Sequence, residues 1–346
     1  MAYTTINKSK DYFNTKIYTG NSSNGHAITG VGFQPDWVWI KNRGGSGDHA
    51  LHDVVRGVNK RLVSNNANSE STLSDGVQSF DSDGFTLGDA GNYNGSSTYV
   101  SWNWKAGNSQ GSSNTDGSIN TTYTSVNATA GFSISKYDGT GSGATVGHGL
   151  GATPKMIIWK RLDNNAGTTD WLVQSPIWAN RNKLVLNSNA ALAYSSTYAN
   201  VDNWSNSVFT LGTHAAQNAS NGTYVAYCFA EKTGYSKFGS YTGNGNADGS
   251  FIYTGFKPAW VLIKNSSSAT SWSLYDNKRP GYNEDNAYLL PDTTDSELSD
   301  KDIDLLSNGF KPRTSNSALN TSGDTYIYMA FGQSLVGSNN IPATAR

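Results

Sequence analysis

The sequence has a single cysteine, Cys228, and few charged residues. One cysteine cannot form an intrachain disulfide framework or by itself supply a thiolate metal site, so packed cores must hold the chain together. Charged residues make up 15% of the chain, the formal net charge is −1, and no basic run stands out. The sequence therefore gives no sign of the basic surface that binds phosphates in nucleic-acid complexes, and we expect no nucleic-acid partner.

Long apolar runs are also missing. No run approaches the roughly 20 residues that a membrane-spanning helix needs. The opening stretch "MAYTTINKSKDYFNTK" lacks the apolar segment of a secretory signal. We therefore expect synthesis in the cytoplasm without a secretion signal, and no membrane insertion.

Residues that favour strands and turns are abundant. Aromatic residues make up 12% of the chain, glycine occurs 37 times, and Asn, Ser and Thr dominate the polar positions. Tyr, Trp and Thr favour pleated strands, while Gly, Asn and Ser supply turn geometry. This composition predicts an all-β protein.

Four sequence landmarks occur three times in the same order. The most distinctive is a Gly-Xaa-Xaa-Pro segment that runs through four mostly apolar residues to a lysine: "GFQPDWVWIK" (32–41), "GATPKMIIWK" (151–160) and "GFKPAWVLIK" (255–264). A Tyr-Xaa-Gly precedes each copy, and a segment such as "GFTLG" and a strand-like run such as "TYVSWNW" follow it. A repeated set with near-constant spacing indicates triplication.

The repeats divide the chain into three tandem antiparallel β-sandwich modules, for which we expect jelly-roll or lectin-like wiring. The segment between the first two copies is polar and predicts a linker. The expected parts are an N-terminal arm (1–14), repeat 1 (15–107), a linker (108–131), repeat 2 (132–233), repeat 3 (234–333) and a C-terminal tail (334–346). At least one of the two ends is expected to dock on a partner.

The proline-containing segment could be a sugar-binding platform or a core strand, because Trp37 and Trp39 share one face of a strand. The position of Trp39 is occupied by Ile158 and Leu262 in the other copies, and both faces of the strand are apolar in every copy. This pattern favours a strand covered on both sides. The lysine that ends each segment is expected to extend its amine to the surface.

An Asp-Xaa-Xaa-Arg spacing recurs in two copies, as Asp53 with Arg56 and Asp276 with Arg279. This spacing suits a turn tied by a charge-assisted hydrogen bond, although a carbohydrate or interface contact is an alternative. The second copy has "LVQSPIW" there and lacks the pair.

No constellation predicts catalysis, a metal or a cofactor. The histidines do not align between copies, and no acid occupies an equivalent landmark position in all three. His49 and His52 lack further evident ligands, and "DSDG" and "NADG" lack the ligand series of a calcium loop. We therefore predict a protein that is not an enzyme.

Aromatic residues in polar loops are the best candidates for ligand binding, because amphipathic rings mark adhesive surfaces. We expect these side chains to be exposed and to bind ligand. They are Tyr93, Tyr194, Tyr198, Trp204 and Tyr282.

The sequence resembles repeat-containing structural proteins in the virions of marine tailed phages that infect cyanobacteria and SAR11-like bacteria. The likeness rests on "MAYTTINKSKDYFNTKIYTG", "GFQPDWVWIKNR", "HDVVRG", "FDSDGFTLG", "YVSWNWKAG", "GHGLGATPKMIIWK", "YVAYCFAEKTGYSKFGSYTGNG", "GFKPAWVLIK", "YIYMAFG" and "PATAR". It covers nearly the whole chain.

The resemblance implies a location on the virion surface, with other virion proteins of the tail or capsid as partners. We expect a tail fibre or tail-associated appendage that contacts host surface glycans. A capsid decoration or head-fibre protein is the first alternative, and a glycan depolymerase is the second. A homotrimer is expected from phage appendages, although the chain has no heptads for a coiled coil and three modules in one chain can themselves imitate a trimer.

Overall fold

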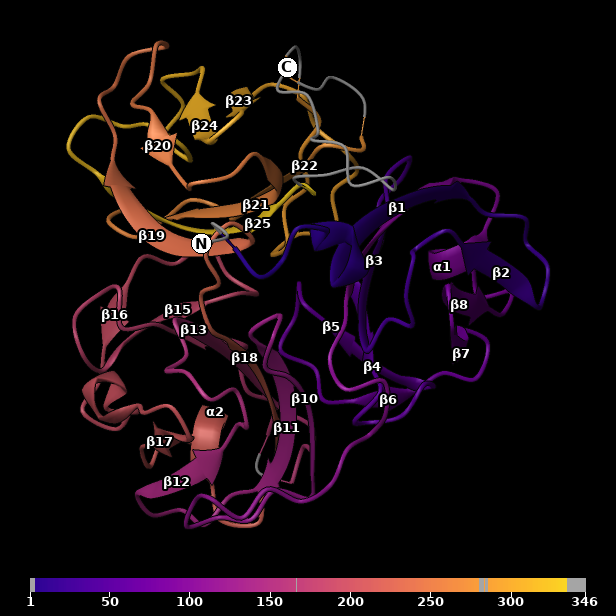
Figure 1. The fold of residues 1–346 in the computed structure, drawn as a ribbon, viewed down its shortest axis with the longest axis vertical. Coiled ribbons are helices and arrows are strands. Elements are labelled where there is room, and N and C mark those ends of the chain that lie inside the picture. Colours follow the sequence, from indigo (N-terminus) through magenta and orange to yellow (C-terminus); the bar gives the residue numbers. More distant parts are fainter. Residues whose placement is uncertain (1–3, 166, 280–282, 284–285, 335–346) are drawn as a thin grey trace.

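The computed structural model describes residues 4–165, 167–279, 283 and 286–334. Nearly all of its regular structure is strand, in antiparallel sheets, which confirms the all-β sandwich prediction. Three modules surround a common centre, with strands β1 to β9 on the right of Figure 1, β10 to β18 at the lower left and β19 to β25 at the upper left.

Each module packs a large inner sheet against a small outer sheet. In module 1 the inner sheet has the order β1 (Phe13–Thr19), β9 (Thr98–Trp104), β3 (Trp37–Asn42), β4 (Ala50–Asp53), β5 (Lys60–Val63) and β6 (Ser71–Thr72). The outer sheet has the order β2 (His26–Thr29), β8 (Gly84–Leu87) and β7 (Val77–Asp81). The first and last long strands of the module are therefore neighbours.

Modules 2 and 3 repeat this order in the strands that they share with module 1, although the numbers of strands differ. The inner sheet of module 2 contains β10 (Tyr123–Asn127), β11 (Phe132–Asp138), β18 (Thr223–Phe229), β13 (Met156–Arg161), β14 (Leu172–Gln174), β15 (Asn182–Val185) and β16 (Ala193–Tyr194), and its outer sheet contains β12 (Ala144–Gly147) and β17 (Val208–Leu211). In module 3 the inner sheet is β19 (Ser236–Thr242), β25 (Thr325–Gly332), β21 (Pro258–Asn265) and β22 (Ser273–Asp276), and the outer sheet is β20 (Ile252–Tyr253), β24 (Gly309–Pro312) and β23 (Ile303–Leu306).

In the described residues, helical structure is confined to single turns. These are η1 (Ser9–Asp11), α1 (Gly91–Asn94), η2 (Val201–Asn203) and α2 (Ala215–Asn218). α1 and α2 lie at matching places, just before the last strands of modules 1 and 2.

The proline-containing strand is buried on both faces, as predicted. On β3, Val38 and Ile40 point into the core between the two sheets of module 1. Trp37 and Trp39 point the other way, into a core that all three modules share. Successive side chains of a strand alternate between faces, so one strand serves two cores. Trp37 and Trp39 are therefore core residues.

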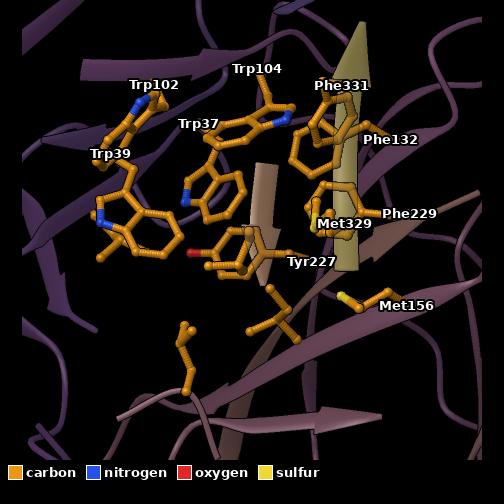
Figure 2. Close-up of a cluster of buried hydrophobic side chains, with 14 of the residues drawn as sticks. Trp37, Trp39, Trp102, Trp104, Phe132, Met156, Tyr227, Phe229, Met329 and Phe331 are labelled. Carbon is orange, nitrogen blue, oxygen red and sulfur yellow. The ribbon is translucent and has the colours of Figure 1, made fainter. Parts of the chain in front are cut away.

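The shared core is an aromatic cluster at the centre of the molecule, shown in Figure 2. Trp37 of module 1 stacks on Tyr227 of module 2, with ring centroids 4.5 Å apart. Trp104 meets Trp260 of module 3 edge to face at 5.6 Å. Phe229 of module 2 and Phe331 of module 3 lie 6.1 Å apart. Each module therefore contacts both of the others through buried rings.

The segment expected to be a linker, 108–131, is partly structured. It supplies β10, which pairs with β11 at the edge of the module 2 sheet. Ile119 is buried and forms a parallel bridge with Val146 of β12. The polar composition hid this strand, because an edge strand needs few apolar residues.

The N-terminal arm docks within the chain. Ile6 is buried in the shared core. Ser9 Oγ donates to the Gln333 carbonyl of module 3 at 3.3 Å, and Tyr12 meets the Tyr235 ring edge to face at 6.1 Å. The described part of the arm therefore joins the beginning of the chain to module 3. Residues 335–346 of the expected C-terminal tail lie outside the described part.

Candidate functional site

The lysines that end the proline-containing strands are buried, which corrects the expectation that their amines reach the surface. Each amine donates to a backbone carbonyl of a neighbouring module. These bonds are Lys41 to Thr294 at 3.3 Å, Lys160 to Ala67 at 3.1 Å and Lys264 to Asn189 at 3.2 Å. Module 1 thus holds a loop of module 3, module 2 a loop of module 1, and module 3 a loop of module 2.

A backbone hydrogen bond accompanies each of these lysine contacts. It joins the residue three positions after the carbonyl to the residue two positions after the lysine. The bonds run from Glu70 N to Leu162 O at 2.9 Å, from Leu192 N to Ser266 O at 2.9 Å and from Glu297 N to Arg43 O at 3.0 Å. The three modules therefore close into a ring with approximate threefold symmetry.

Burial lowers the pKa of each of these lysines to about 8, opposed by acidic residues such as Asp295 near Lys41 and Asp292 near Lys264. The carbonyl contacts satisfy donors of the ammonium group but bring no full negative charge. Burial of the charged amines is therefore unfavourable for folding, and a paired carboxylate would reduce that free-energy cost.

The two Asp-Xaa-Xaa-Arg turns form as predicted. Arg56 Nε donates to Asp53 Oδ2, and Arg279 Nε donates to Asp276 Oδ2 at 2.7 Å, with all four side chains buried. Burial alone would raise the pKa of Asp276, but the Arg279 guanidinium and a hydrogen bond from Trp102 hold it below its usual value.

Each turn also accepts a hydrogen bond from another module, which the sequence did not reveal. Tyr227 of module 2 donates its hydroxyl to Asp53 Oδ2 at 2.7 Å. Trp102 Nε1 of module 1 donates to Asp276 Oδ2 at 2.9 Å. The interface alternative for these pairs is thus realised between modules of the same chain.

The third copy of this pattern has no ion pair. The register of β13 with β14 places Ser175 where the other modules have Asp53 and Asp276. The residue equivalent to the donors Trp102 and Tyr227 is Met329, which lies in the shared core. The donor and the acceptor are therefore lost together at the junction of modules 3 and 2, so no buried carboxylate is left unpaired there.

Three of the predicted loop aromatics are buried, so the expectation of exposure is wrong for them. Tyr93 lies in the module 1 core and donates its hydroxyl to His52 Nε2 at 2.9 Å, since His52 Nδ1 donates to the Val58 carbonyl. Trp204 packs edge to face on Trp159 at 5.9 Å. Tyr198 is 7% exposed.

Of the four that the structure describes, only Tyr194 is exposed, at 65%, and it lies in β16. Tyr282 lies outside the described residues. The four described candidates therefore do not form one exposed surface. The side chain that does reach a pocket is the buried Tyr198.

That pocket is a hollow of about 360 Å³ in module 2, beside the junction with module 1. Its polar wall comes from Asp170 just before β14, Lys183 of β15, Tyr198, and His214 at the start of α2. Ala67 of module 1 completes it. The pocket therefore lies next to the Lys160 amine, which holds the carbonyls of Ala67 and Thr169.

The polar groups of this pocket are held in place by one another. The Tyr198 and His214 rings lie 4.4 Å apart, tilted by 53°. Lys183 Nζ lies 5.8 Å from the centre of the Tyr198 ring. Asp170 Oδ1 accepts from Asn187 Nδ2 at 2.9 Å. Burial lowers the pKa of Lys183 and of His214, with Asp170 opposing both shifts.

The histidine has a defined tautomer. His214 Nδ1 accepts the backbone N–H of Ala216 at 3.1 Å, so in the neutral ring the proton is on Nε2. The lowered pKa favours that neutral ring near pH 7. The site can therefore present an ammonium group, an imidazole N–H, a carboxylate and an aromatic ring to one small ligand.

Residues 8–334 match a family model described as a domain of unknown function, DUF7483. The chain belongs to the DUF7483 family. The match spans all three modules and the shared core, so in this chain the DUF7483 unit is the closed three-module body and not a single sandwich. No curated protein shows significant similarity to the chain.

Within the described residues of this DUF7483 protein, no three His, Cys, Asp or Glu side chains gather closely enough to hold a metal ion. In the same part of the chain no helix has the length and hydropathy needed to cross a membrane. Cys228 is buried in the module 2 core, where burial raises the pKa of its thiol.

Proposed function

We propose that this protein is a structural component exposed on a phage particle, a tail fibre or tail-associated appendage that contacts host surface glycans and catalyses no reaction. The observation that carries the proposal is the closed body of three sandwiches around one aromatic core. Such a body is a rigid scaffold whose polar loops point outward, and loop variation on a constant scaffold suits surface recognition.

The geometry also favours the alternative of a capsid decoration protein. A single chain with approximate threefold symmetry matches a threefold position of a larger assembly, where three equivalent surfaces meet. The proposed partners are then shell proteins around that position, and the glycan-facing loops point away from the shell.

Purified particles test the proposal. Cryo-electron microscopy of virions, with the three-module body fitted into unassigned density, should find it on the tail or on the shell. Its absence from particles, checked by mass spectrometry of the same preparation, would reject both locations. Release of oligosaccharides from host envelope polysaccharide would instead support a depolymerase.

A further inference from the structure

We propose that the pocket between Asp170, Lys183, Tyr198 and His214 binds a sugar that carries a carboxylate, such as a uronic acid unit of a surface glycan. This inference deepens the proposed function, on which its biological setting rests, by naming a site and a ligand class. It stands on the pocket and on the groups that line it.

Two polar groups in the pocket make no hydrogen bond with the described residues. Lys183 Nζ has no hydrogen bond or close ion pair within the described chain: it lies 5.8 Å from the centre of the Tyr198 ring, and Asp170 attracts it from farther away. Thr169 Oγ1 is buried and makes no hydrogen bond within the described chain. A buried polar atom without a partner costs free energy, and a ligand that supplies the partner recovers it.

The other two modules show what happens when these positions are filled by the protein itself. Strand register places Arg61 of module 1 at the position of Lys183, and Arg61 pairs with Asp48 at 3.9 Å. Module 3 has Tyr288 there, which donates its hydroxyl to Asp300 and lies 4.7 Å below Lys301 Nζ. In module 2 no described carboxylate pairs with the lysine at such a distance, and Asp170 attracts its ammonium group only from farther away.

The walls differ in the same way. Ala90 and His214 occupy equivalent positions, because each precedes the short helix of its module. Gly76 and Tyr198 are also equivalent, because the residues just before them make matching backbone contacts with Gly88 and Gly212. In module 1 a Cβ atom at Gly76 would lie 3.3 Å from the Tyr93 ring, so that space is already filled. Module 2 has instead brought Tyr198 and His214 to the rim of an open hollow.

Each lining group has a part in recognising an acidic sugar. The ammonium group of Lys183 would bind the carboxylate, which makes the strongest kind of hydrogen bond available there. His214 Nε2–H and Thr169 Oγ1 would bind hydroxyls, and Asp170 would accept from a further hydroxyl. A volume of about 360 Å³ suits one or two sugar rings.

The test uses the full chain, with methyl glucuronide as the probe and methyl glucoside as its neutral counterpart. Titration calorimetry and saturation-transfer NMR should show saturable binding of the glucuronide and weaker binding of the glucoside. Lys183→Met should weaken glucuronide binding by roughly tenfold, the loss of about one charge-assisted contact, and Lys183→Arg should retain most of it. The matched control is Arg61→Met at the equivalent position of module 1, which should leave binding unchanged.

Equal affinity for the two sugars, an unchanged affinity in Lys183→Met, or no binding of either probe would overturn the inference. Thermal melts of each variant separate lost binding from lost folding, and His214→Ala provides a second variant if Lys183→Met does not fold. The test is independent of the particle experiment: glucuronide binding by a protein absent from virions rejects the proposed function and keeps the site, and the reverse result rejects the site alone.

Discussion

A single side chain in the shared core joins modules 1 and 2. Trp37 is 1% exposed and contacts the rings of Trp39 and Trp104 in its own module and of Tyr227 and Phe229 in module 2. Trp37→Ala should lower the free energy of unfolding by roughly 3–5 kcal/mol, because the cavity cannot close without moving two sheets. Chemical denaturation of the full chain measures it.

The control for that substitution is Tyr194→Ala, because Tyr194 is 65% exposed. Its effect should stay within about 0.5 kcal/mol. A small effect of Trp37→Ala together with lost glycan binding would instead mean that the tryptophan serves a ligand.

The hydroxyl of Tyr227 tests the polar contact between modules 2 and 1. Tyr227→Phe removes the donor to Asp53 while leaving the ring stacked on Trp37. The free energy of unfolding should fall by roughly 1–3 kcal/mol, since a buried carboxylate oxygen loses a partner. Tyr194→Phe is the matched control, and equal melting of the two variants would contradict an energetic role for this hydrogen bond.

At the scale of the element, the proline-containing strands should make stability depend on pH. The pKa of Lys264 is about 8 in the folded chain and about 10.4 when unfolded. Between these values the unfolded state binds more protons, so the free energy of unfolding rises with pH. Buried tyrosines with raised pKa values, such as Tyr275, oppose this only where the unfolded chain ionises its tyrosines, near pH 10 and above.

Thermal melts between about pH 7.5 and 9.5 measure the effect. The melting temperature of the wild type should rise with pH relative to that of Lys264→Met, which has no titrating amine. Parallel pH profiles for the two proteins would show that the buried amine is not the cause.

The repeated landmarks predict the proline-containing strands, but they do not predict which parts of the other modules pack against them. The apolar quartet of each proline-containing strand indicated burial on both faces, and the structure confirms it for Trp37 and Val38 alike. The lysine after the quartet was misjudged because its carbonyl partners come from another module. Sequence neighbours of Lys41 give no sign of Thr294, which lies more than two hundred positions away.

The candidate pocket was only partly predictable, for a related reason. The polar neighbours of Tyr198 in the sequence predict exposure, yet its side chain packs with the module 2 core and also lines the hollow. Lys183, His214 and Asp170 come from separate segments that share no spacing pattern. A comparison of Lys183 with Arg61 and Tyr288 at equivalent strand positions is the signal that could have drawn attention to module 2.

For the whole molecule, the shared core predicts that the modules fold together. A fragment of residues 108–233, which keeps β10, would expose Phe132, Tyr227 and Phe229, which the other modules cover in the full chain. We expect this fragment to aggregate or to bind a hydrophobic dye, while the full chain melts in one transition. Independent folding of the fragment, shown by dispersed amide resonances, would contradict this.

The closure of the ring also bears on the oligomeric state, which stays a prediction. A homotrimer was expected by analogy with phage appendages, whereas each module interface of the ring is already made within one chain. We now expect a monomer of 37.1 kDa for the isolated protein. Mass photometry at nanomolar concentration distinguishes it from a particle of three times that mass, which would restore the homotrimer.

The uneven contacts at the three junctions have a consequence for how the copies can be exchanged. Trp102 faces Asp276 and Tyr227 faces Asp53, while Met329 belongs to the junction that has Ser175. If modules 2 and 3 traded places around the axis, Met329 would face Asp53 and a tryptophan would face Ser175. The three modules are therefore not interchangeable, because each junction residue matches only one neighbour. We expect a recombinant with its modules in another order to misfold, even though the modules share a strand order.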